Sequence, residues 1–308
     1  MNLVSIITPS YNQSAYLEQT IQSVLAQEYQ PLEYLIVDGG STDGSLEIIQ
    51  KYASRLAWWI SERDAGQADA INKGLQQARG EIVAWLNSDD LYLPGAVSQA
   101  VAAFQTGPGA GLVFGDAVSI DASGRQLNRL SIGDWGLEEL ACFRIICQPA
   151  VFMRREVLEQ VGVLDPSYHY LLDHQLWLRI AQAAPVRHVP QVWAAARQHP
   201  GAKNVAQPAG FGQEALRILA WMEAQPGLAA YLSANRRRVE AGAYRLNARY
   251  LLDGEQPGPA LRAYGRALLR SPGFTLQHWH RMLYALLSLA GGKGLAELYY
   301  RLRRKGSV

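Results

Sequence analysis

Two adjacent carboxylates directly follow an apolar run in the first third of the sequence. The stretch EIVAWLNSDD (81–90) has the pattern of a buried strand that ends in Asn87, Ser88, Asp89 and Asp90. Mg²⁺ and Mn²⁺ prefer oxygen ligands, and Mg²⁺ usually binds through one or two carboxylates plus substrate phosphates. The alternative is structural, because Asp also closes turns and caps helices. Metal binding is the hypothesis for Asp89 and Asp90, and for Asp90 a helix cap is an equally open alternative.

The segments before this motif alternate between strand-like and helix-like apolar patterns. Strands are expected at 3–12, at 32–45 with the strand itself ending in Asp38, at 56–63 and at 81–90, and helices at 14–27, 45–53 and 66–80. This order predicts a mostly parallel sheet flanked by helices on both faces. Ligands bind at the carboxyl ends of such strands. We therefore expect the polar residues after the four strands to meet at one edge.

The remainder of the chain changes character after about residue 211. Strands and helices are mixed up to about 204, and a helical pattern then continues to the end. Residues 235–272 pair two amphipathic helices across DGEQPG, which is similar to a single tetratricopeptide-like hairpin. One such pair does not establish a repeat array. The predicted domains are residues 1–204 and a helical extension at 205–308.

Composition and charge narrow the classes of protein. Residues 1–204 hold 14 Lys and Arg against 21 Asp and Glu, or −7, whereas residues 205–308 hold 15 against 6, or +9. The first region has no basic stripe, so nucleic acid is not an expected partner. Cys142 and Cys147 do not have metal-cluster spacing, and they indicate a reducing compartment. The apolar run 282–290 is shorter than the ~20 residues that span a bilayer. We expect no signal peptide and a cytoplasmic protein.

The last residues are basic. Arg301, Arg303, Arg304 and Lys305 follow two tyrosines. Such clusters are attracted to anionic lipid, and tyrosine favours the interface of the bilayer. One hypothesis is peripheral attachment to the inner face of the membrane. The alternative is charge complementarity between the basic extension and the acidic first region.

Four segments, in this order, resemble the motifs of family 2 glycosyltransferases: VSIITPSYNQSAYLEQTIQSVLAQ, LIVDGGSTDGS, DAGQADAINKGLQQARGEIVAWLNSDD and QPAVFMRREVLEQVGVLDPSYHYLLDHQLWLRI. The resemblance implies a GT-A fold, a Rossmann-like α/β fold, over residues 1–204. It also implies inverting transfer of a sugar from a nucleotide diphosphate sugar, UDP-linked, to a hydroxyl of a carbohydrate or lipid-linked acceptor, with Mg²⁺ or Mn²⁺ as cofactor. Cell-surface polysaccharide or glycolipid assembly is the implied setting.

The resemblance also implies roles for individual residues. Asp89 matches the metal ligand of the family's DxD motif, Asp90 follows it, and Asp173 matches the catalytic base. The implied donor-site residues are Thr8, Pro9, Tyr11, Asp38, Asn87, Ser88 and His199. The sequence departs from the family pattern at Gly39, where a second acid is common, at Asn87 in place of the first DxD acid, and at Leu172 before the base.

Asp173 is suited to inversion, because a single in-line displacement needs a base that takes the proton from the acceptor hydroxyl. The alternative is that it caps the following helix, and both roles are compatible. Lys73 is a candidate contact for the diphosphate, or otherwise a solvated helix lysine, and Asp69 either binds the donor or is a surface acid. Trp135, His169 and His174 are candidate acceptor contacts, with ordinary packing or polar roles as the alternatives.

Two other functions are weighed against sugar transfer. A nucleotidyltransferase also uses paired acids and Mg²⁺, but the segment TPSYNQSAYL lacks its Gly-rich basic signature. A non-catalytic nucleotide-sugar-binding protein would retain the fold without needing Asp89 or Asp173, and both are present.

Overall fold

The computed structural model describes residues 2–289 and Gly294 of the 308-residue chain. The basic residues Arg301, Arg303, Arg304 and Lys305 lie outside the described residues, so their proposed contact with lipid stays a prediction. Two compact units form. Unit 1 comprises Met1–Leu140 and Ile145–His199, and unit 2 comprises Ala141–Arg144 and Pro200–Val308.

Within the described residues, unit 1 is built on one nine-stranded sheet in the order β3-β2-β1-β4-β8-β6-β9-β5, with β7 paired to β6. The strands are β1 (Val4–Ser10), β2 (Leu32–Asp38), β3 (Trp58–Ser61), β4 (Ile82–Trp85), β5 (Leu91–Tyr92), β6 (Leu112–Ile120), β7 (Gln126–Leu130), β8 (Val151–Arg154) and β9 (Val186–Arg197). The predicted parallel order is confirmed for β1 to β4. Beyond β4 the sheet is mixed, because β8 runs antiparallel to both β4 and β6.

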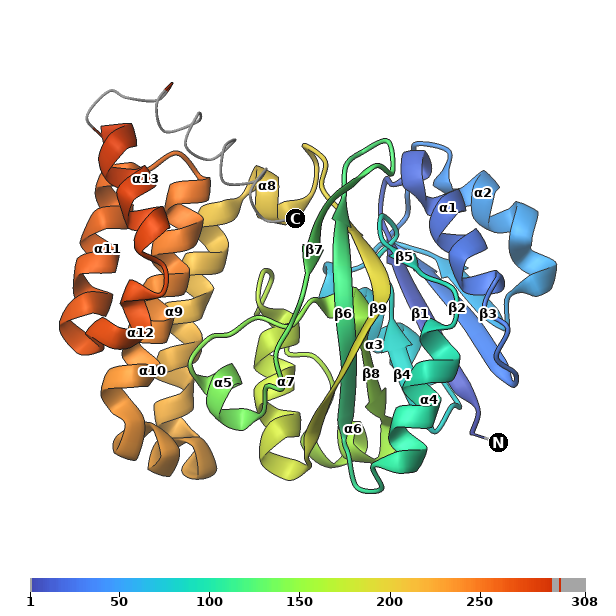
Figure 1. Ribbon diagram of the computed structural model, residues 1–308. Coiled ribbons are helices and arrows are strands. Elements are labelled where there is room, and N and C mark those ends of the chain that lie inside the picture. The colour runs from blue at the N-terminus through green and yellow to red at the C-terminus, as the bar shows by residue number, and fades with distance from the viewer. Residues whose placement is uncertain (1, 290–293, 295–308) are drawn as a thin grey trace. The chain divides into compact units, whose positions relative to one another are not determined.

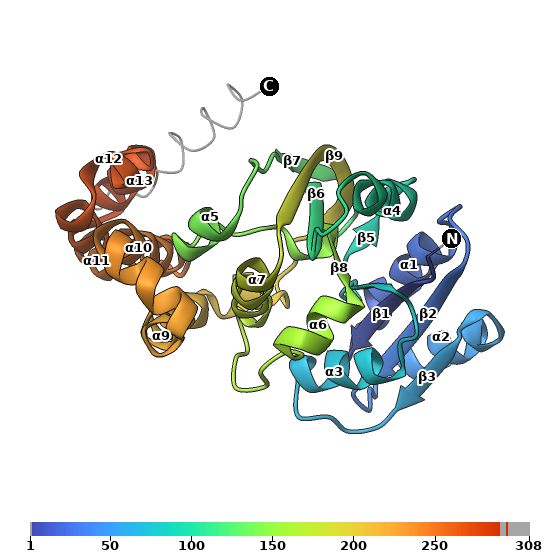
Figure 2. The ribbon, with the colours of Figure 1, turned by 90° about the horizontal axis from the view of Figure 1, so that it is seen from below.

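Helices cover both faces of this sheet. Their bounds are α1 (Ser14–Leu25), α2 (Ser45–Tyr52), α3 (Gln67–Gln77), α4 (Ala96–Thr106), α5 (Leu137–Ala141), α6 (Arg155–Val161) and α7 (Leu172–Ala183), with 3₁₀ turns η1 (Ala53–Arg55) and η2 (Gln148–Ala150). Helices α1 and α4 lie on one side of the sheet, and α3, α6 and α7 lie on the other (Figure 2).

The central strand β1 explains this two-sided covering, because all seven of its residues are buried. Successive side chains of a strand point to opposite faces. Ile6 belongs to the apolar cluster that contains Leu17 of α1 and Val97 of α4. Ile7 points to the other face, where a side chain at Gly74 of α3 would collide with it. Gly74 therefore lets α3 lie directly on the sheet.

Unit 2 is helical in the part that the structure describes (Figure 1). Its helices are α8 (Lys203–Ala206), α9 (Pro208–Ala224), α10 (Pro226–Asp253), α11 (Pro257–Arg270), α12 (Pro272–Leu276) and α13 (Trp279–Leu289). Each helix from α9 to α12 begins at a proline, whose fixed φ suits the first helical position. Helix α10 is interrupted at Asn235, where φ is −120° and ψ is 18°.

Helices α10 and α11 pack along each other across the turn 254–256, as the paired amphipathic patterns predict. A tetratricopeptide-like character for this pair stays a prediction. None of the helices formed by residues 2–289 is both long and apolar enough to cross a bilayer.

Candidate active site

The loop after β2 is organised around a buried carboxylate. Oδ2 of Asp38 accepts hydrogen bonds from the backbone N–H of Gly40 at 3.1 Å and of Ser41 at 2.9 Å, and from the hydroxyl of Ser61 at 2.6 Å. Its Oδ1 accepts the Ser41 hydroxyl at 2.5 Å. Asp38 has no exposed surface. Its carboxylate therefore holds the Gly-rich loop in place, and a contact with the base or ribose stays a prediction.

A second acid reaches this loop from the end of β3. A Cβ added at Gly39 would lie 2.6 Å from Oδ2 of Asp64 and 3.3 Å from the ring of Tyr11. The other carboxylate oxygen of Asp64 accepts the backbone N–H of Gly66 at 2.9 Å. Gly39 thus provides the room that the Asp64 carboxylate occupies. The Asp64 carboxylate thus lies beside the position where the resemblance places a second acid.

Of the donor residues predicted at the end of β1 and just after it, two are buried and one is exposed. Thr8 is fully buried, and its hydroxyl is 2.9 Å from the hydroxyl of Tyr34 on β2. Pro9 is also buried within β1. Tyr11, by contrast, is 61% exposed beside Gly39 and Asp64. Of these three predicted residues, Tyr11 is therefore the one whose ring is open to a ligand.

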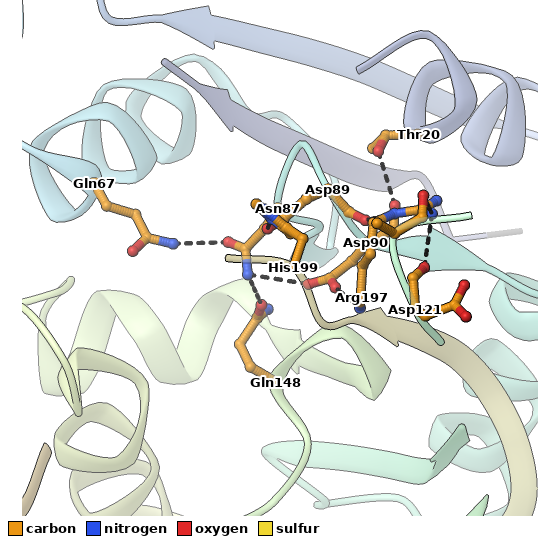
Figure 3. A network of polar contacts seen from close by, with 10 residues as sticks. Thr20, Gln67, Asn87, Asp89, Asp90, Asp121, Gln148, Arg197 and His199 are labelled. Carbon is orange, nitrogen blue, oxygen red and sulfur yellow. Dashed lines mark hydrogen bonds and ion pairs between the residues drawn. The ribbon is translucent and has the colours of Figure 1, made fainter. Parts of the chain in front are cut away.

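The turn after β4 is fixed by the side chain of Asn87 (Figure 3). Its Oδ1 accepts a hydrogen bond from Gln67 of α3 at 2.7 Å, and its Nδ2 donates to Asp90 at 3.2 Å and to Gln148 of η2 at 3.0 Å. Gln148 in turn donates to the carbonyl of Trp85 at 2.8 Å. An amide is needed here because a carboxylate could not donate the last two bonds of Asn87.

This network predicts the effect of restoring an acid at position 87. Asn87→Asp would remove the donor to Oδ2 of Asp90 and to Oε1 of Gln148, and it would add a carboxylate beside Asp90. We expect the free energy of unfolding to fall by about 1–3 kcal/mol at neutral pH. Urea denaturation measures this free energy. Asn128→Asp on the exposed strand β7 is the matched control. Equal stability of both variants would contradict the assigned role of Asn87.

The two adjacent carboxylates of the turn have different surroundings. Asp90 is 6% exposed, and its Oδ1 accepts the backbone N–H of Arg197 at 2.9 Å. Burial, followed by the charge of Asp89, raises the pKa of Asp90 well above its ordinary value. The side chain of Asp89 is 19% exposed, and its Oδ2 lies 3.0 Å from Nε2 of His199. Asp89 is thus the acid open to a ligand, and the placement of Asp90 favours its structural alternative. Ser88, which precedes both acids, is buried.

Arg197, which no sequence motif singles out, holds this turn from the end of β9. It is 4% exposed. Its Nε donates to the carbonyl oxygen of Asp89 at 2.8 Å, and its Nη2 donates to Gln19 of α1 at 2.9 Å. The guanidinium lies 4.8 Å from the ring centroid of Tyr16, which is 4.6 Å from the ring of His199. Arg197 and His199 together fix both the backbone and the carboxylate of Asp89.

Asp173 lies in the first turn of α7, whose N-cap is Leu171, and its role as the base stays a prediction. Its Oδ1 accepts the backbone N–H of His174 at 2.7 Å. One turn later, Trp177 stacks on Trp85 of β4, with ring centroids 5.2 Å apart and planes at 22°. Burial, followed by the charges of Asp90 and Asp173, raises the pKa of the Cys147 thiol. The stacking of Trp177 on Trp85 therefore packs the first half of α7 against the end of β4.

A comparison with known families assigns this arrangement. Residues 5–162, just over half of the chain, match the family model described as Glycosyl transferase family 2. This chain is a family 2 glycosyltransferase. An uncharacterized glycosyltransferase of Nostoc sp. is 36% identical over 175 residues, which cover 53% of this chain and 54% of that relative. The glycosyltransferase described here thus spans about half the length of that relative.

Two further relatives of the glycosyltransferase carry names from polysaccharide biosynthesis. The O-antigen biosynthesis protein RfbC of Myxococcus xanthus is 30% identical over 202 residues, which cover 64% of this chain and 16% of that relative. TuaG of Bacillus subtilis, named for teichuronic acid biosynthesis, is 47% identical over 93 residues. These residues cover 29% of this chain and 37% of that relative.

Solved structures share the fold of this glycosyltransferase. Staphylococcus aureus TarS 1–349 superposes with a TM-score of 0.63 at 17% identity, covering 99% of this chain and 92% of that chain. A mannosyltransferase from Pyrobaculum calidifontis, solved with GDP-Man and Mn²⁺, superposes with a TM-score of 0.62 at 22% identity. The match covers 94% of this chain and 86% of that chain. The predicted GT-A fold is therefore confirmed.

The donor residues predicted on α3 of the glycosyltransferase lie in an ion-pair cluster. Nζ of Lys73 is 2.8 Å from Oε1 of Glu62 and 3.5 Å from Oδ2 of Asp69. The hydrogen bond with Glu62 is the main cause that raises the pKa of Lys73. Asp69 also accepts the backbone N–H of Ala65 at 3.0 Å. Lys73 is thus neutralised by neighbouring acids, and a contact of Lys73 or Asp69 with the donor stays a prediction.

Asn72, the neighbour of Lys73, positions the chain that leads to Asp173. Its Nδ2 donates to the carbonyl of Leu164 at 2.9 Å, and its Oδ1 accepts the N–H of Leu164 at 3.1 Å. This pair of bonds fixes the loop before α7 against α3. The sequence alone could not predict these two hydrogen bonds, because Asn72 and Leu164 are 92 positions apart.

The three candidate acceptor contacts of the glycosyltransferase differ in exposure. His169 is exposed in the loop before α7, whereas His174 is only 1% exposed on α7 itself. Trp135 is half-buried just before α5. Burial disfavours a direct contact for His174, and acceptor binding by any of the three stays a prediction.

The available ligands fit a divalent ion only in part. Among the described residues, no group of three or more His, Cys, Asp or Glu side chains converges as a metal site. Asp89 offers one accessible carboxylate. That number suits Mg²⁺ or Mn²⁺ when donor phosphates and water supply the other oxygens.

Proposed function

We propose that this glycosyltransferase moves a sugar, with inversion, from a UDP-sugar to an acceptor hydroxyl. The observation that carries the proposal is the stacking of Trp177 on Trp85, which anchors the start of α7 to the strand that ends in the Asp89 turn. A candidate base and a candidate diphosphate site therefore share one support. The S. aureus neighbour was also solved with UDP-GlcNAc, which supports a UDP-linked donor here.

The residues of the chain divide the work of this reaction. Asp173 takes the proton of the acceptor hydroxyl as the new glycosidic bond forms. Tyr11 stacks on the nucleotide base from the exposed loop after β1, beside the loop that Asp38 shapes. Asp89, held by His199 and Arg197, is aimed at the diphosphate. A divalent ion bound to Asp89 would neutralise the charge of the leaving nucleotide diphosphate.

Metal use is part of the proposal, and Asp89 is its assigned ligand. The Mn²⁺ in the structure of the P. calidifontis mannosyltransferase supports this use. Asp90 acts behind Asp89, through its hydrogen bonds to Arg197 and Asn87.

The proposed acceptor is a carbohydrate or a lipid-linked sugar of a cell-surface polysaccharide or glycolipid. The relatives named for O-antigen and teichuronic acid biosynthesis support this class. We also propose a cytoplasmic location with peripheral attachment to the inner face of the membrane. Flotation on anionic liposomes tests this attachment. Equal flotation of the protein with and without residues 299–308 would contradict attachment through this segment.

A donor screen tests the proposed function. Hydrolysis of UDP-, GDP- and dTDP-sugars is followed with and without Mn²⁺, in the wild type and in Asp89→Ala. We expect hydrolysis of one UDP-sugar to UDP, lost on chelation of the metal and reduced at least about a hundredfold in Asp89→Ala. Hydrolysis at the same rate after chelation of the metal and in Asp89→Ala would refute the role of Asp89 as the metal ligand.

The same screen separates the two rival functions. Release of UMP with sugar phosphate, in place of UDP, would indicate cleavage between the two phosphates, as in nucleotidyl transfer. Binding of a donor by the wild type without turnover of any donor or acceptor tested would favour a non-catalytic binding protein.

A further inference from the structure

Arg245 of α10 is a buried cation whose charge has no carboxylate beside it among the described residues. The residue is 8% exposed. Its Nη2 donates to the carbonyl oxygen of Phe143 at 2.6 Å, and its guanidinium lies 5.7 Å from the ring centroid of Phe274. Its Nε is buried, and no described residue accepts a hydrogen bond from it. A charge taken out of water without a pairing anion is costly.

Further arginines of unit 2 lie near Arg245, and one of them, Arg249, follows it one turn later on α10. Arg144 lies 5.7 Å from the same Phe274 ring. Arg249 and Arg281 share the carboxylate of Asp253, at 3.6 and 3.0 Å. These four guanidinium groups and the Asp253 carboxylate together carry a formal charge of +3. Such a concentration of positive charge in a partly desolvated place favours the arrival of an anion.

The titration of neighbouring groups reflects the same excess of positive charge. Burial, followed by the charge of Arg249, lowers the pKa of Arg245 to about 10, and Arg144 and Arg281 add to the decrease. Burial, followed by the charge of Arg245, lowers the pKa of His278 to about 3. His278 is therefore neutral here and adds an imidazole to the wall of the cluster.

We propose that Arg144, Arg245, Arg249 and Arg281 form a binding site for a phosphate group. Guanidinium groups present paired donors whose geometry matches phosphate oxygens, and several of them can share one tetrahedral anion. The partly exposed side chains give solvent access, because Arg281 is 22% and Arg249 is 40% exposed. The ligand class is a phosphate monoester or diester, free or as a lipid headgroup. This site is separate from the donor chemistry and does not depend on it.

A purely structural role for the cluster is the alternative. Phe143 has a left-handed φ of 57°, and a side chain at Gly242 of α10 would collide with the carbonyl of Cys142. Arg245 therefore helps to hold residues 141–144 against α10. That role needs one hydrogen bond to the Phe143 carbonyl, and it accounts for neither the unused Nε nor the three further arginines.

Binding of inorganic phosphate and pyrophosphate to the full chain tests the proposal. We expect a saturable rise of a few degrees in melting temperature relative to chloride at equal ionic strength. Arg249→Gln and Arg281→Gln should each weaken the affinity about tenfold, as measured by calorimetry. Arg245 is left unchanged, because its removal would also remove the bond to Phe143.

Two control variants show whether phosphate binding is specific to the cluster. Arg262→Gln removes an exposed arginine of α11 and should leave the affinity unchanged. Asp89→Ala alters the candidate donor site and should also leave it unchanged. The proposal is overturned if the wild type shows no saturable response, if Arg262→Gln weakens binding as much as the cluster variants, or if Asp89→Ala abolishes binding.

A vesicle experiment distinguishes a lipid headgroup from a soluble phosphate ester as the ligand. Cosedimentation compares phosphatidic acid with phosphatidylcholine vesicles, using the wild type and Arg249→Gln. Binding that needs both phosphatidic acid and Arg249 assigns a lipid headgroup to the site. A response to soluble phosphate without vesicle binding supports a soluble phosphate ester.

Discussion

Asp173→Asn is expected to slow turnover of the donor by about 10²–10⁴-fold, the usual contribution of a positioned general base. The amide has the same shape as the carboxylate, and its oxygen can still accept the hydrogen bond from the backbone N–H of His174. The start of α7 should therefore keep its conformation, while the group that accepts the proton is lost. The Kd for UDP, measured by calorimetry, should stay within about twofold, because the base does not contact the nucleotide.

A matched variant separates catalysis from helix stability in this experiment. Glu47→Gln removes a carboxylate from the first turn of α2, where the residue is exposed. It tests the loss of an acid near a helix N-terminus, which by itself contributes about 0.3–1 kcal/mol. We expect its turnover to equal that of the wild type. Full activity of Asp173→Asn would show that Asp173 serves only the first turn of α7.

Trp177→Ala is expected to lower the free energy of unfolding by about 3–5 kcal/mol, the range for removing a large buried aromatic side chain. Trp177 is 1% exposed, and its ring stacks on Trp85. Because this contact joins α7 to β4, the variant should also lose turnover beyond the loss that its unfolded fraction causes. Urea denaturation and donor hydrolysis at a temperature where the variant is folded measure both effects.

The stacking itself is tested with two further variants. Trp177→Phe keeps an aromatic ring and should recover most of the lost turnover. Trp279→Ala removes a tryptophan that is 55% exposed and should change stability by less than about 0.5 kcal/mol. Normal turnover by Trp177→Ala would mean that the Trp85 contact does not position Asp173.

The sequence predicted those parts of the fold that depend on local patterns. Alternating apolar segments were sufficient for β1 to β4 and the helices between them, because each element buries its own periodic face. The antiparallel insertion of β8 between β4 and β6 could not be predicted in this way. Its register is set by partners about 40 to 70 residues distant, and no period within β8 encodes them.

In the candidate site, too, residues in local motifs could be predicted, whereas residues that act through distant contacts could not. Asp89 and Asp173 stand in recognisable motifs, in the turn after β4 and in the first turn of α7. Arg197 is 108 residues from the carbonyl of Asp89 that it binds, and Asn72 is 92 residues from Leu164. Side chains of this kind act on the backbone of a distant segment. Their contribution becomes visible only when the chain is folded.

The close approach of Asp64 to Gly39 has a consequence for any attempt to modify this enzyme. An acid introduced at position 39 would compete for space and charge with the carboxylate already present, whereas Asp64→Gly alone would leave the loop with neither acid. Because the two residues occupy one location, the energetic effects of changing them will not add. A redesign that adds a side chain at position 39 therefore has to shorten the side chain of Asp64 in the same step.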